Sequence, residues 1–482
     1  MLNPVILSKN DAPEWLRTKT HHGDTMETIS RKIARFVTNL RYEDLPQNVV
    51  HEVKRFLLDS IGCAFGGYRV EDVEIVLQVL HELGGVSEAT LIACGGKTSA
   101  YNATLANSLM IRAMDYNDIY WQQDPSHPSD IIPAALAVGE KVGKSGKDVI
   151  VGIVLAYEFE MRLCEFAVPG IRERKWHHAS LTQFVSPIVA GKMLDLNEDQ
   201  MVSAIGIGGC HNFTPGAVTA GKLTMMKNTV DPLAVQSGVI AAQLAQKGYT
   251  GPEAIFEGKE GFVDTFGGRF DLAILTDGLG DSYRILECSM KAYPTEALTH
   301  SPITATLELV KKHNIQHRDI EKVQVKTIAR AVDILADPSK YKPTTKETAD
   351  HSLPYCIAAA IVAGKITPEE FTEEKLKDPA IWALLPKIEV IADPELEKVF
   401  PELKAAIVEI RTKNGHCYSM RVDYPKGDYR APMSEEELLV KFHSLADAVV
   451  SRDRQDQIIE AIWNLEKINS IGNFMELLIA DK

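Results

Sequence analysis

Cysteine is scarce in this 482-residue sequence, and its arrangement excludes several kinds of site. The seven cysteines stand alone along the chain, their number is odd, and no two form a CxxC pair. Such a set predicts neither a disulfide framework nor a cysteine-ligated zinc or iron–sulfur centre. We therefore expect buried, reduced thiols in a reducing compartment.

Long apolar runs are absent as well. No stretch of about 18 or more apolar residues occurs, so the sequence predicts no membrane-spanning helix. The first residues lack the basic segment followed by an apolar stretch that a secretory signal would have. Residues 1–23 are expected to form a loosely attached arm. These features predict a cytoplasmic protein.

Positive charge is in deficit. The chain has 52 Lys and Arg residues against 66 Asp and Glu residues, which gives a net charge of −14. A surface this acidic disfavours nucleic acid and anionic membranes as partners. A small anionic substrate would therefore need a local cluster of Lys, Arg or His side chains to bind it.

Helical periodicity dominates the sequence up to about residue 286. Asp24 or Thr25 is expected to cap the first helix, and Pro46 to start the second. Asp231 followed by Pro232 is interpreted as the cap and first turn of another helix. Several segments are Ala-rich or apolar on every side, which is typical of a thick core of closely packed helices. The further helices are expected over residues 103–113, 131–142, 149–166, 181–194 and 231–246.

The pattern changes after residue 287. Alternation of apolar and polar residues predicts strands over residues 320–328, 387–391, 406–411 and 417–424. A hairpin turn is expected at 413–415, and helices return from Ser434. We therefore predict a mainly α protein. A large all-helical domain is formed by both chain ends (1–286 and 431–482), with a smaller α/β domain (287–430) inserted between them.

Polar, titratable residues follow the Ala-rich helix that is expected to end near residue 113. Asp115, Asp118, His127 and Asp130 occur there, within the motifs MDYND and HPSD. Carboxylates and an imidazole in one short segment suit general acid–base catalysis or binding of polar substrate groups. A helix cap followed by a solvated loop would explain the same residues. A metal site is less favoured, because no HxxxH motif or second compact ligand group accompanies them.

Two further segments bring histidines and a lysine. In the motif KWHH, either His177 or His178 could face a cleft while the other caps the following helix or is solvated. Lys227 follows a glycine-rich stretch, where it could anchor a carboxylate or be a solvated loop lysine. Within that stretch, Gly216 to Lys222 match GxxxxGK. The next residue is leucine and no strand precedes the motif, so we exclude nucleotide binding.

The junction of the two predicted domains carries a fourth segment, KAYPTE, with Lys291 and Glu296. Ligand sites favour domain interfaces, which gives Lys291 a positional argument. An exposed linker lysine is the alternative interpretation. A fifth segment, ADHSLPY, places His351 and Tyr355 just before an Ala-rich helix, where a helix cap is the alternative.

Together these five segments resemble the MmgE/PrpD family, whose members include 2-methylcitrate dehydratase and cis-aconitate decarboxylase. The resemblance spans about residues 25–475 and rests on the order of the motifs MDYND, HPSD, KWHH, MMK, KAYP and HSLPY. It implies a large helical domain with a smaller α/β lid, and a homodimer. The family's dehydratase members work without an iron–sulfur cluster, and we expect neither a metal nor another cofactor here.

The resemblance also implies roles for individual residues. Glu296 stands where the decarboxylase has a histidine, which is similar to the dehydratases and favours dehydration over decarboxylation. The implied catalytic residues are Asp115, His127, His177 and Lys227. The implied substrate-binding residues are Asp118, Lys291, Glu296, His351 and Tyr355.

The expected reaction is dehydration of a small polycarboxylic hydroxy acid, namely 2-methylcitrate to 2-methylaconitate in propionate catabolism. His127 and His177 are the candidate base and acid, and the sequence does not decide between them. Asp115 would orient or tune one of them, while Lys227 and Lys291 would neutralise substrate carboxylates. The alternatives are decarboxylation of cis-aconitate, epimerisation of a dicarboxylate, a metal-dependent hydrolase and an inactive helical scaffold.

Overall fold

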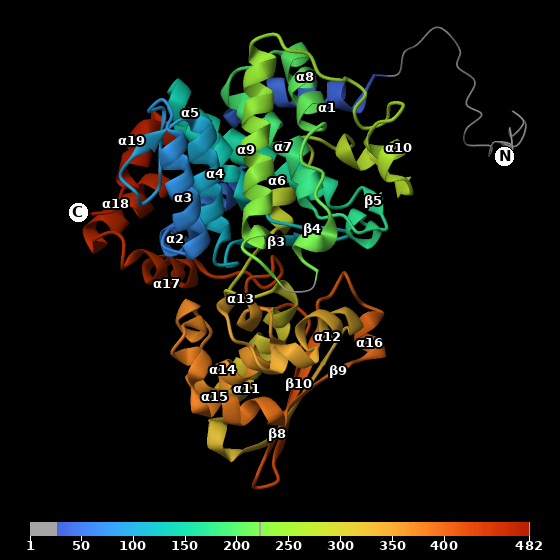
Figure 1. Ribbon diagram of the computed structural model, residues 1–482, viewed down its shortest axis with the longest axis vertical. Coiled ribbons are helices and arrows are strands. Elements are labelled where there is room, and N and C mark those ends of the chain that lie inside the picture. Colours follow the sequence, from blue (N-terminus) through green and yellow to red (C-terminus); the bar gives the residue numbers. More distant parts are fainter. Residues whose placement is uncertain (1–26, 221–222, 482) are drawn as a thin grey trace, which may run out of the picture.

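Buried apolar side chains gather into two large hydrophobic clusters, one in each body of the molecule (Figure 1). The computed structural model describes residues 27–220 and 223–481. The cluster of the upper body in Figure 1 takes residues from 29–290 and from 433–478, so segments far apart in the chain share one core. The cluster of the lower body is drawn almost entirely from 293–422. Helices dominate the secondary structure, which confirms the mainly α prediction.

The upper body is a stack of helices, several of which are buried on all sides. α7 and α9 pack closely because Gly238 of α9 faces Ser186 and Pro187 of α7, where an added Cβ would lie 2.5 Å from the Ser186 Cβ. None of the helices among the described residues combines the length and the apolar composition that a membrane span needs. The helices of the upper body are α1 (Ile29–Asn39), α2 (Gln47–Gly67), α3 (Glu71–Leu83), α4 (Ala100–Arg112), α5 (Ile132–Val142), α6 (Gly146–Leu163), α7 (Ala179–Met193), α8 (Glu198–Gly208), α9 (Met226–Gln246), α10 (Phe262–Phe266), α17 (Glu435–Ala446), α18 (Arg452–Trp463) and α19 (Ile471–Leu477).

The first two helices begin with identifiable caps. The side-chain oxygen of Thr28 caps α1. The predicted caps Asp24 and Thr25 lie outside the described residues. Pro46 is the N-cap of α2, as its fixed backbone geometry predicts, and the helix extends to Gly67.

The predicted start of α9 is wrong. The helix begins at Met226, so Asp231 and Pro232 lie inside it rather than at its cap. The Asp-Pro pair is a local capping signal, but here the Asp231 carboxylate is buried against His178. A tertiary contact therefore overrides the local preference.

The upper body also contains short strands that the helical prediction missed. β3 (Asp118–Trp121) pairs antiparallel with β4 (Pro125–Ser126) and with β7 (Ser289–Met290). The register places Asp118 opposite Met290, which joins two segments that are distant in the sequence. The all-helical description of this part is therefore wrong at this edge. The other short strands of the upper body are β1 (Ala89–Thr90), β2 (Lys97–Thr98), β5 (Ala167–Val168) and β6 (Arg269–Phe270).

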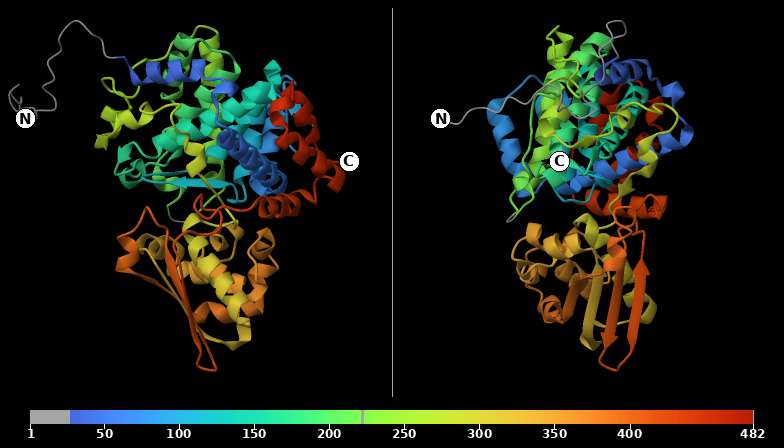
Figure 2. Two further views of the ribbon diagram at one scale, coloured as in Figure 1. Left: turned by 180° about the vertical axis from the view of Figure 1, so that it is seen from behind. Right: turned by 90° about the vertical axis from the view of Figure 1, so that its right-hand side faces the viewer.

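The lower body packs helices on one face of a four-stranded sheet of order β11-β10-β8-β9 (Figure 2). β9 runs parallel to β8, whereas β10 pairs antiparallel with β8 and forms the predicted hairpin with β11. The four strand predictions are confirmed to within a few residues. The strands are β8 (Ile320–Thr327), β9 (Ile388–Ala392), β10 (Ala406–Thr412) and β11 (Cys417–Val422). The helices are α11 (His300–His313), α12 (Ala329–Leu335), α13 (Lys346–Ala349), α14 (Leu353–Ala363), α15 (Pro379–Leu384) and α16 (Pro394–Glu397).

Candidate active site

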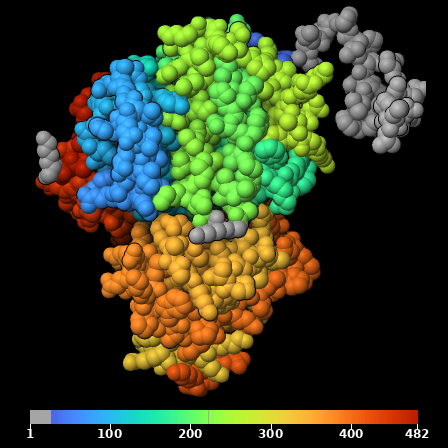
Figure 3. Space-filling model, viewed as in Figure 1, coloured from blue at the N-terminus to red at the C-terminus, as the bar shows by residue number. Residues whose placement is uncertain are grey.

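A cavity of about 1140 Å³ lies at the junction of the two bodies, whose seam is visible in Figure 3. Eight Lys or Arg residues and five Asp or Glu residues line it, an excess of three positive charges in a chain whose net charge is −14. Such a local concentration of positive charge attracts small anions. The cationic residues are Arg112, Arg172, Lys175, Lys227, Lys291, Arg330, Lys340 and Lys342.

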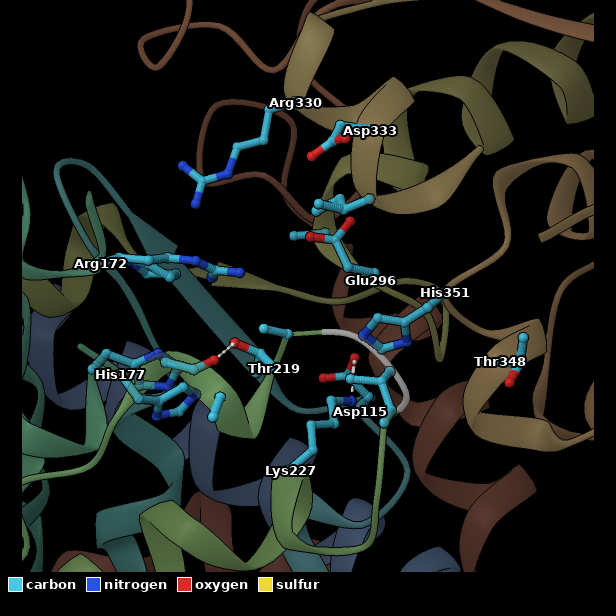
Figure 4. Close-up of a pocket in the computed structure, with 18 of the residues that line it drawn as sticks. Asp115, Arg172, His177, Thr219, Lys227, Glu296, Arg330, Asp333, Thr348 and His351 are labelled. Atoms are coloured by element: carbon cyan, nitrogen blue, oxygen red, sulfur yellow. Dashed lines mark hydrogen bonds and ion pairs between the residues drawn. The ribbon is translucent and has the colours of Figure 1, made fainter. Parts of the chain in front are cut away.

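Asp115 lies beside Lys227 on one side of the cavity (Figure 4). It follows α4 with a left-handed backbone (φ 52°), a conformation that aspartate tolerates better than most residues. Its Oδ1 accepts hydrogen bonds from Arg112 at 2.5 Å and Lys291 at 2.7 Å, and its Oδ2 lies 3.2 Å from the Lys227 Nζ. Burial alone would raise the pKa of Asp115, but Lys227, Lys291 and Arg112 hold it well below its usual range. The carboxylate therefore orients the two lysines, and it also opposes the lowering of the His127 pKa.

The two lysines reach this point from distant elements. Lys227 is the second residue of α9, and Lys291 follows β7, whose pairing with β3 brings it beside Asp115. Both are buried, with exposed fractions of 6% and 2%. Burial lowers the pKa of Lys291, and Asp115 opposes this shift. A lysine in the first turn of a helix is disfavoured by the helix dipole, and the ion pair with Asp115 stabilises Lys227 there.

His127 presents an unprotonated ring nitrogen to the cavity. Its Nδ1 lies 2.6 Å from the carbonyl oxygen of Asp118. Because a carbonyl can only accept, Nδ1 carries the proton, and Nε2 of the neutral ring keeps its lone pair. Burial, together with Arg112 and Lys291, lowers the pKa of His127 well below its usual value. The geometry is that of a general base.

His177 has the opposite tautomer. The backbone N–H of Ala179 donates to its Nδ1 at 3.2 Å, so Nε2 carries the proton and is a hydrogen-bond donor. The backbone N–H of His177 donates a hydrogen bond to the carbonyl oxygen of Thr214 at 2.8 Å. The backbone N–H of Gly216 donates to the carbonyl oxygen of Lys175 at 2.7 Å. The glycine-rich loop therefore holds the KWHH segment in place. Burial and the neighbouring His178 lower the pKa of His177 well below its usual value.

His178 is buried beside His177 rather than solvated, and both line the cavity. Its Nε2 lies 3.2 Å from the Oδ2 of Asp231. Burial alone would raise the pKa of Asp231, but His178 lowers it. His177, His178 and Asp231 form the one group among the described residues whose ligand atoms, all within 4.8 Å of one another, could hold a metal ion. The Oδ1 of Asp231 lies 3.3 Å from the Thr182 hydroxyl, whereas its Oδ2 and both ring nitrogens of His178 are buried without a hydrogen-bond partner among the described residues.

A layer of buried carboxyl groups lies behind the histidines. Glu160 accepts hydrogen bonds from the hydroxyls of Ser126 and Thr182. Burial raises its pKa to about 8, although these hydroxyls oppose the shift. Burial also raises the pKa of Asp130 well above its usual value, against the effect of Arg112. The Oδ2 of Asp130 also lies 3.6 Å from the Nε of Arg112, so this layer continues the charge network around Asp115.

The lower body contributes the facing wall through Glu296 and His351 (Figure 4). One oxygen of Glu296 accepts from the backbone N–H of Leu298 at 2.7 Å, and burial raises its pKa although His351 opposes this. The Nδ1 of His351 lies 2.5 Å from the Oδ1 of Asp350. The backbone N–H of Glu296 donates a hydrogen bond to the carbonyl oxygen of Asp350 at 3.1 Å, so the segments that carry Glu296 and His351 support each other.

Two predicted site residues do not line the cavity. The Tyr355 hydroxyl donates to the carbonyl of Glu370 at 2.7 Å in the interior of the lower body. The Asp118 carboxylate accepts from the backbone and hydroxyl of Ser129, at 2.9 and 2.6 Å, and burial raises its pKa to about 6. Asp118 therefore supports His127 through its carbonyl. Among the described residues, no hydrogen bond joins its carboxylate to the His127 ring, and the two are not among the groups that could hold a metal ion, as a metal-dependent hydrolase would need.

The sequence reasoning missed several residues that build the site. Arg112 was detectable, because it is the single charge on α4 and precedes Asp115 by three residues. Asp231 was noticed but interpreted as a helix cap. Arg172 and Glu160 give no comparable signal, because their positions depend on how distant segments fold together.

The amino-acid sequence is similar to known proteins along most of its length. Residues 31–275 match the MmgE/PrpD N-terminal domain, and residues 293–467 match the MmgE/PrpD C-terminal domain. The chain is 26% identical over 475 residues to a cis-aconitate decarboxylase of Aspergillus terreus, covering 93% of this chain and 96% of the relative. It is 25% identical to the human cis-aconitate decarboxylase over 464 residues, covering 94% and 95%. It is 22% identical to the 2-methylcitrate dehydratase of Salmonella typhi over 499 residues, covering 95% and 99%.

Proposed function

Because the chain belongs to the MmgE/PrpD family, we propose that it is a lyase that removes water from a small polycarboxylic hydroxy acid. The proposed reaction converts 2-methylcitrate to 2-methylaconitate. The observation that carries this proposal is the pairing of an unprotonated imidazole, His127, with a carboxyl group of raised pKa, Glu296, in one cationic cavity. Dehydration needs such a base and such an acid.

The elimination begins at the carbon next to a substrate carboxylate. Lys227 and Lys291 bind this carboxylate and stabilise the negative charge that develops on it, which makes the adjacent proton more acidic. The Nε2 of His127 takes the proton. The electron pair of the C–H bond forms the double bond, and the C–O bond to the hydroxyl group breaks.

The departing hydroxyl leaves as water. Glu296 donates the proton that completes it, so His127 ends the step protonated and Glu296 ends it ionised. The Nε2–H of His177 donates a hydrogen bond to the substrate oxygens. Exchange of protons with solvent restores the starting states after product release.

We further propose that the lower body acts as a lid. It carries Glu296 and His351, so the acid meets the base only where the two bodies come together. Exclusion of water from such a junction strengthens the interactions of the lysines with substrate. The homodimer implied by the family resemblance stays a prediction, which light scattering of the purified protein would test.

The pH dependence of kcat/KM tests the roles of the two groups. His127 must be neutral, so the rate is expected to fall as pH drops through its lowered pKa. Glu296 must be protonated, so the rate is expected to fall as pH rises through its raised pKa. Glu296→Gln is expected to reduce kcat by about 100-fold or more and to remove the alkaline limb. An alkaline limb that persists in this variant would show that another group is the acid.

A substrate panel tests the reaction itself. We expect the protein to form the conjugated alkene from 2-methylcitrate, detected by ultraviolet absorbance and mass spectrometry, with citrate and isocitrate as alternative substrates. Decarboxylation of cis-aconitate is the second candidate, because the similar proteins include cis-aconitate decarboxylases at 25% and 26% identity. Carbon dioxide release from cis-aconitate without dehydration of any hydroxy acid would favour that reaction. Inverted stereochemistry without either product would favour an epimerase, and no turnover of the whole panel would contradict the proposed substrate class.

A further inference from the structure

Arg172 extends into the cavity from the short helical turn Ile171–Arg174 (Figure 4). The backbone N–H groups of Ile171 and Arg172 donate to the Asp124 carboxylate at 2.8 and 2.9 Å, which fixes the turn. The guanidinium itself has no hydrogen bond or ion pair with any residue of the described ranges 27–220 and 223–481. Burial and the nearby Arg330 lower the pKa of Arg172. A guanidinium with five donors and no acceptor is a prepared anion contact.

The neighbouring Arg174 shows what a structural arginine does in the same turn. Its guanidinium donates to the carbonyl oxygens of Gly267 at 2.5 Å and Pro169 at 2.9 Å, which ties two loops together. Arg172 makes no such contact within the ranges that the structure describes. Because the Arg172 guanidinium, unlike that of Arg174, has no such partner among the described residues, its donors are free to bind a ligand.

A second guanidinium approaches the same place from the lower body. Arg330, in α12, lies 5.5 Å from the ring centroid of Trp121, and Arg172 lies 5.9 Å from that centroid. Arg330 has one ion pair among the described residues, with Glu173 at 2.9 Å. Two guanidinium groups against one indole repel each other, and a single carboxylate pairs with only one of them. A bound anion would supply the negative charge that Arg172 lacks and would reduce the repulsion between the two guanidinium groups.

We propose that Arg172 and Arg330 form an outer subsite for a carboxylate of the substrate, separate from the carboxylate held by Lys227 and Lys291. This inference rests on the proposed function and names its substrate class: anions with at least two carboxylates, one for the lysine pair and one for the arginine pair. Arginine suits this role because its planar fork binds a carboxylate through two parallel hydrogen bonds. The two arginines come from different bodies, so the bound carboxylate links the lower body to the upper one.

The test measures binding without turnover, using tricarballylate, a tricarboxylate that lacks the hydroxyl group to be eliminated. Calorimetry with the full-length protein is expected to show tricarballylate binding weakened about 10- to 100-fold by Arg172→Gln, since charge-assisted hydrogen bonds contribute on this scale. Arg330→Gln is expected to weaken it less, because Glu173 already neutralises part of the charge of Arg330. Arg172→Lys keeps the charge without the fork and is expected to lie between the wild type and Arg172→Gln. Arg318→Gln, an exposed arginine of the lower body, is the matched control and should bind as the wild type does.

The outcomes separate the subsite from the reaction. Tricarballylate affinity within two-fold of wild type in Arg172→Gln would overturn the subsite, as would absence of binding by the wild-type protein. A shift of the alkaline limb of kcat/KM with unchanged affinity would also overturn it, because Arg172 would then serve Glu296. Affinity that depends on Arg172, in a protein that does not dehydrate 2-methylcitrate, would support the subsite and contradict the proposed reaction.

Discussion

Replacing His127 with alanine is expected to lower kcat by about 10²- to 10⁴-fold while the fold is retained. The reason is the tautomer of the ring, which is set by the 2.6 Å contact between Nδ1 and the carbonyl of Asp118 and leaves Nε2 as the base. His127 is buried, with 7% exposure, but it lines the cavity, so the space left by its side chain opens to the cavity and forms no closed void. Steady-state kinetics with 2-methylcitrate would measure the loss, and circular dichroism would verify the fold. His81→Ala, an exposed histidine of α3, is the control.

Lys227→Ala should have a comparable effect through a different step. It removes one of the two cations that stabilise charge on the reacting carboxylate, while Asp115 keeps its bonds to Arg112 and Lys291. The fold should therefore survive. Near-normal turnover in both His127→Ala and Lys227→Ala would contradict the assignment of this cavity as the active site.

Asp115→Asn is expected to reduce the free energy of unfolding by about 3 to 5 kcal/mol and to abolish activity. The change leaves Arg112, Lys227 and Lys291 buried around a neutral group, without the one carboxylate that pairs with all three. The lysines then lose the charge that positions them for substrate. Urea denaturation would measure the loss. Asp199→Asn removes an exposed ion pair with Arg31 and should cost at most about 1 kcal/mol.

The same substitution has a predictable pH dependence. The three cations hold the folded-state pKa of Asp115 well below its usual value. A carboxylate with a lowered pKa stabilises the fold above its unfolded pKa of about 4, and this contribution is lost as pH falls toward the folded-state pKa. The difference in stability between wild type and Asp115→Asn should therefore be constant near neutral pH and shrink in acid. A difference that does not change with pH would contradict the ionised state of Asp115.

Local patterns were enough to predict most elements of the fold. The strands of the lower body alternate strictly enough for each of the four to be identified, and the hairpin at 413–415 has the turn residues that its geometry requires. The strands β3 and β7 could not be predicted in this way. They are short, and they exist because two distant segments pair in a register that no local signal encodes.

The residues of the candidate site also fall into those that local sequence patterns identify and those that depend on contacts between distant segments. Several residues of the site could be identified from the sequence because they are polar residues in apolar surroundings. A charge beside a buried helix is costly unless it is paired or binds a ligand. These residues are the Asp115–Asp130 segment, His177, Lys227, Lys291, Glu296 and His351. The tautomers of the histidines, the three cations on Asp115 and the free guanidinium of Arg172 were not visible. Each depends on contacts between groups that are far apart in the chain, or on the lack of one among the described residues.

The sequence by itself therefore determined the family of the protein, its mainly helical character and seven of the polar residues that line the cavity. Periodicity and residue type are local properties, and they survive in a one-dimensional pattern. Only the tertiary structure decided which residues share the cavity, and that Tyr355 and the Asp118 carboxylate stand outside it. Protonation states and ion pairs follow from distance and burial, which the folded chain sets when β3 meets β7 and the two bodies close on one cationic cavity.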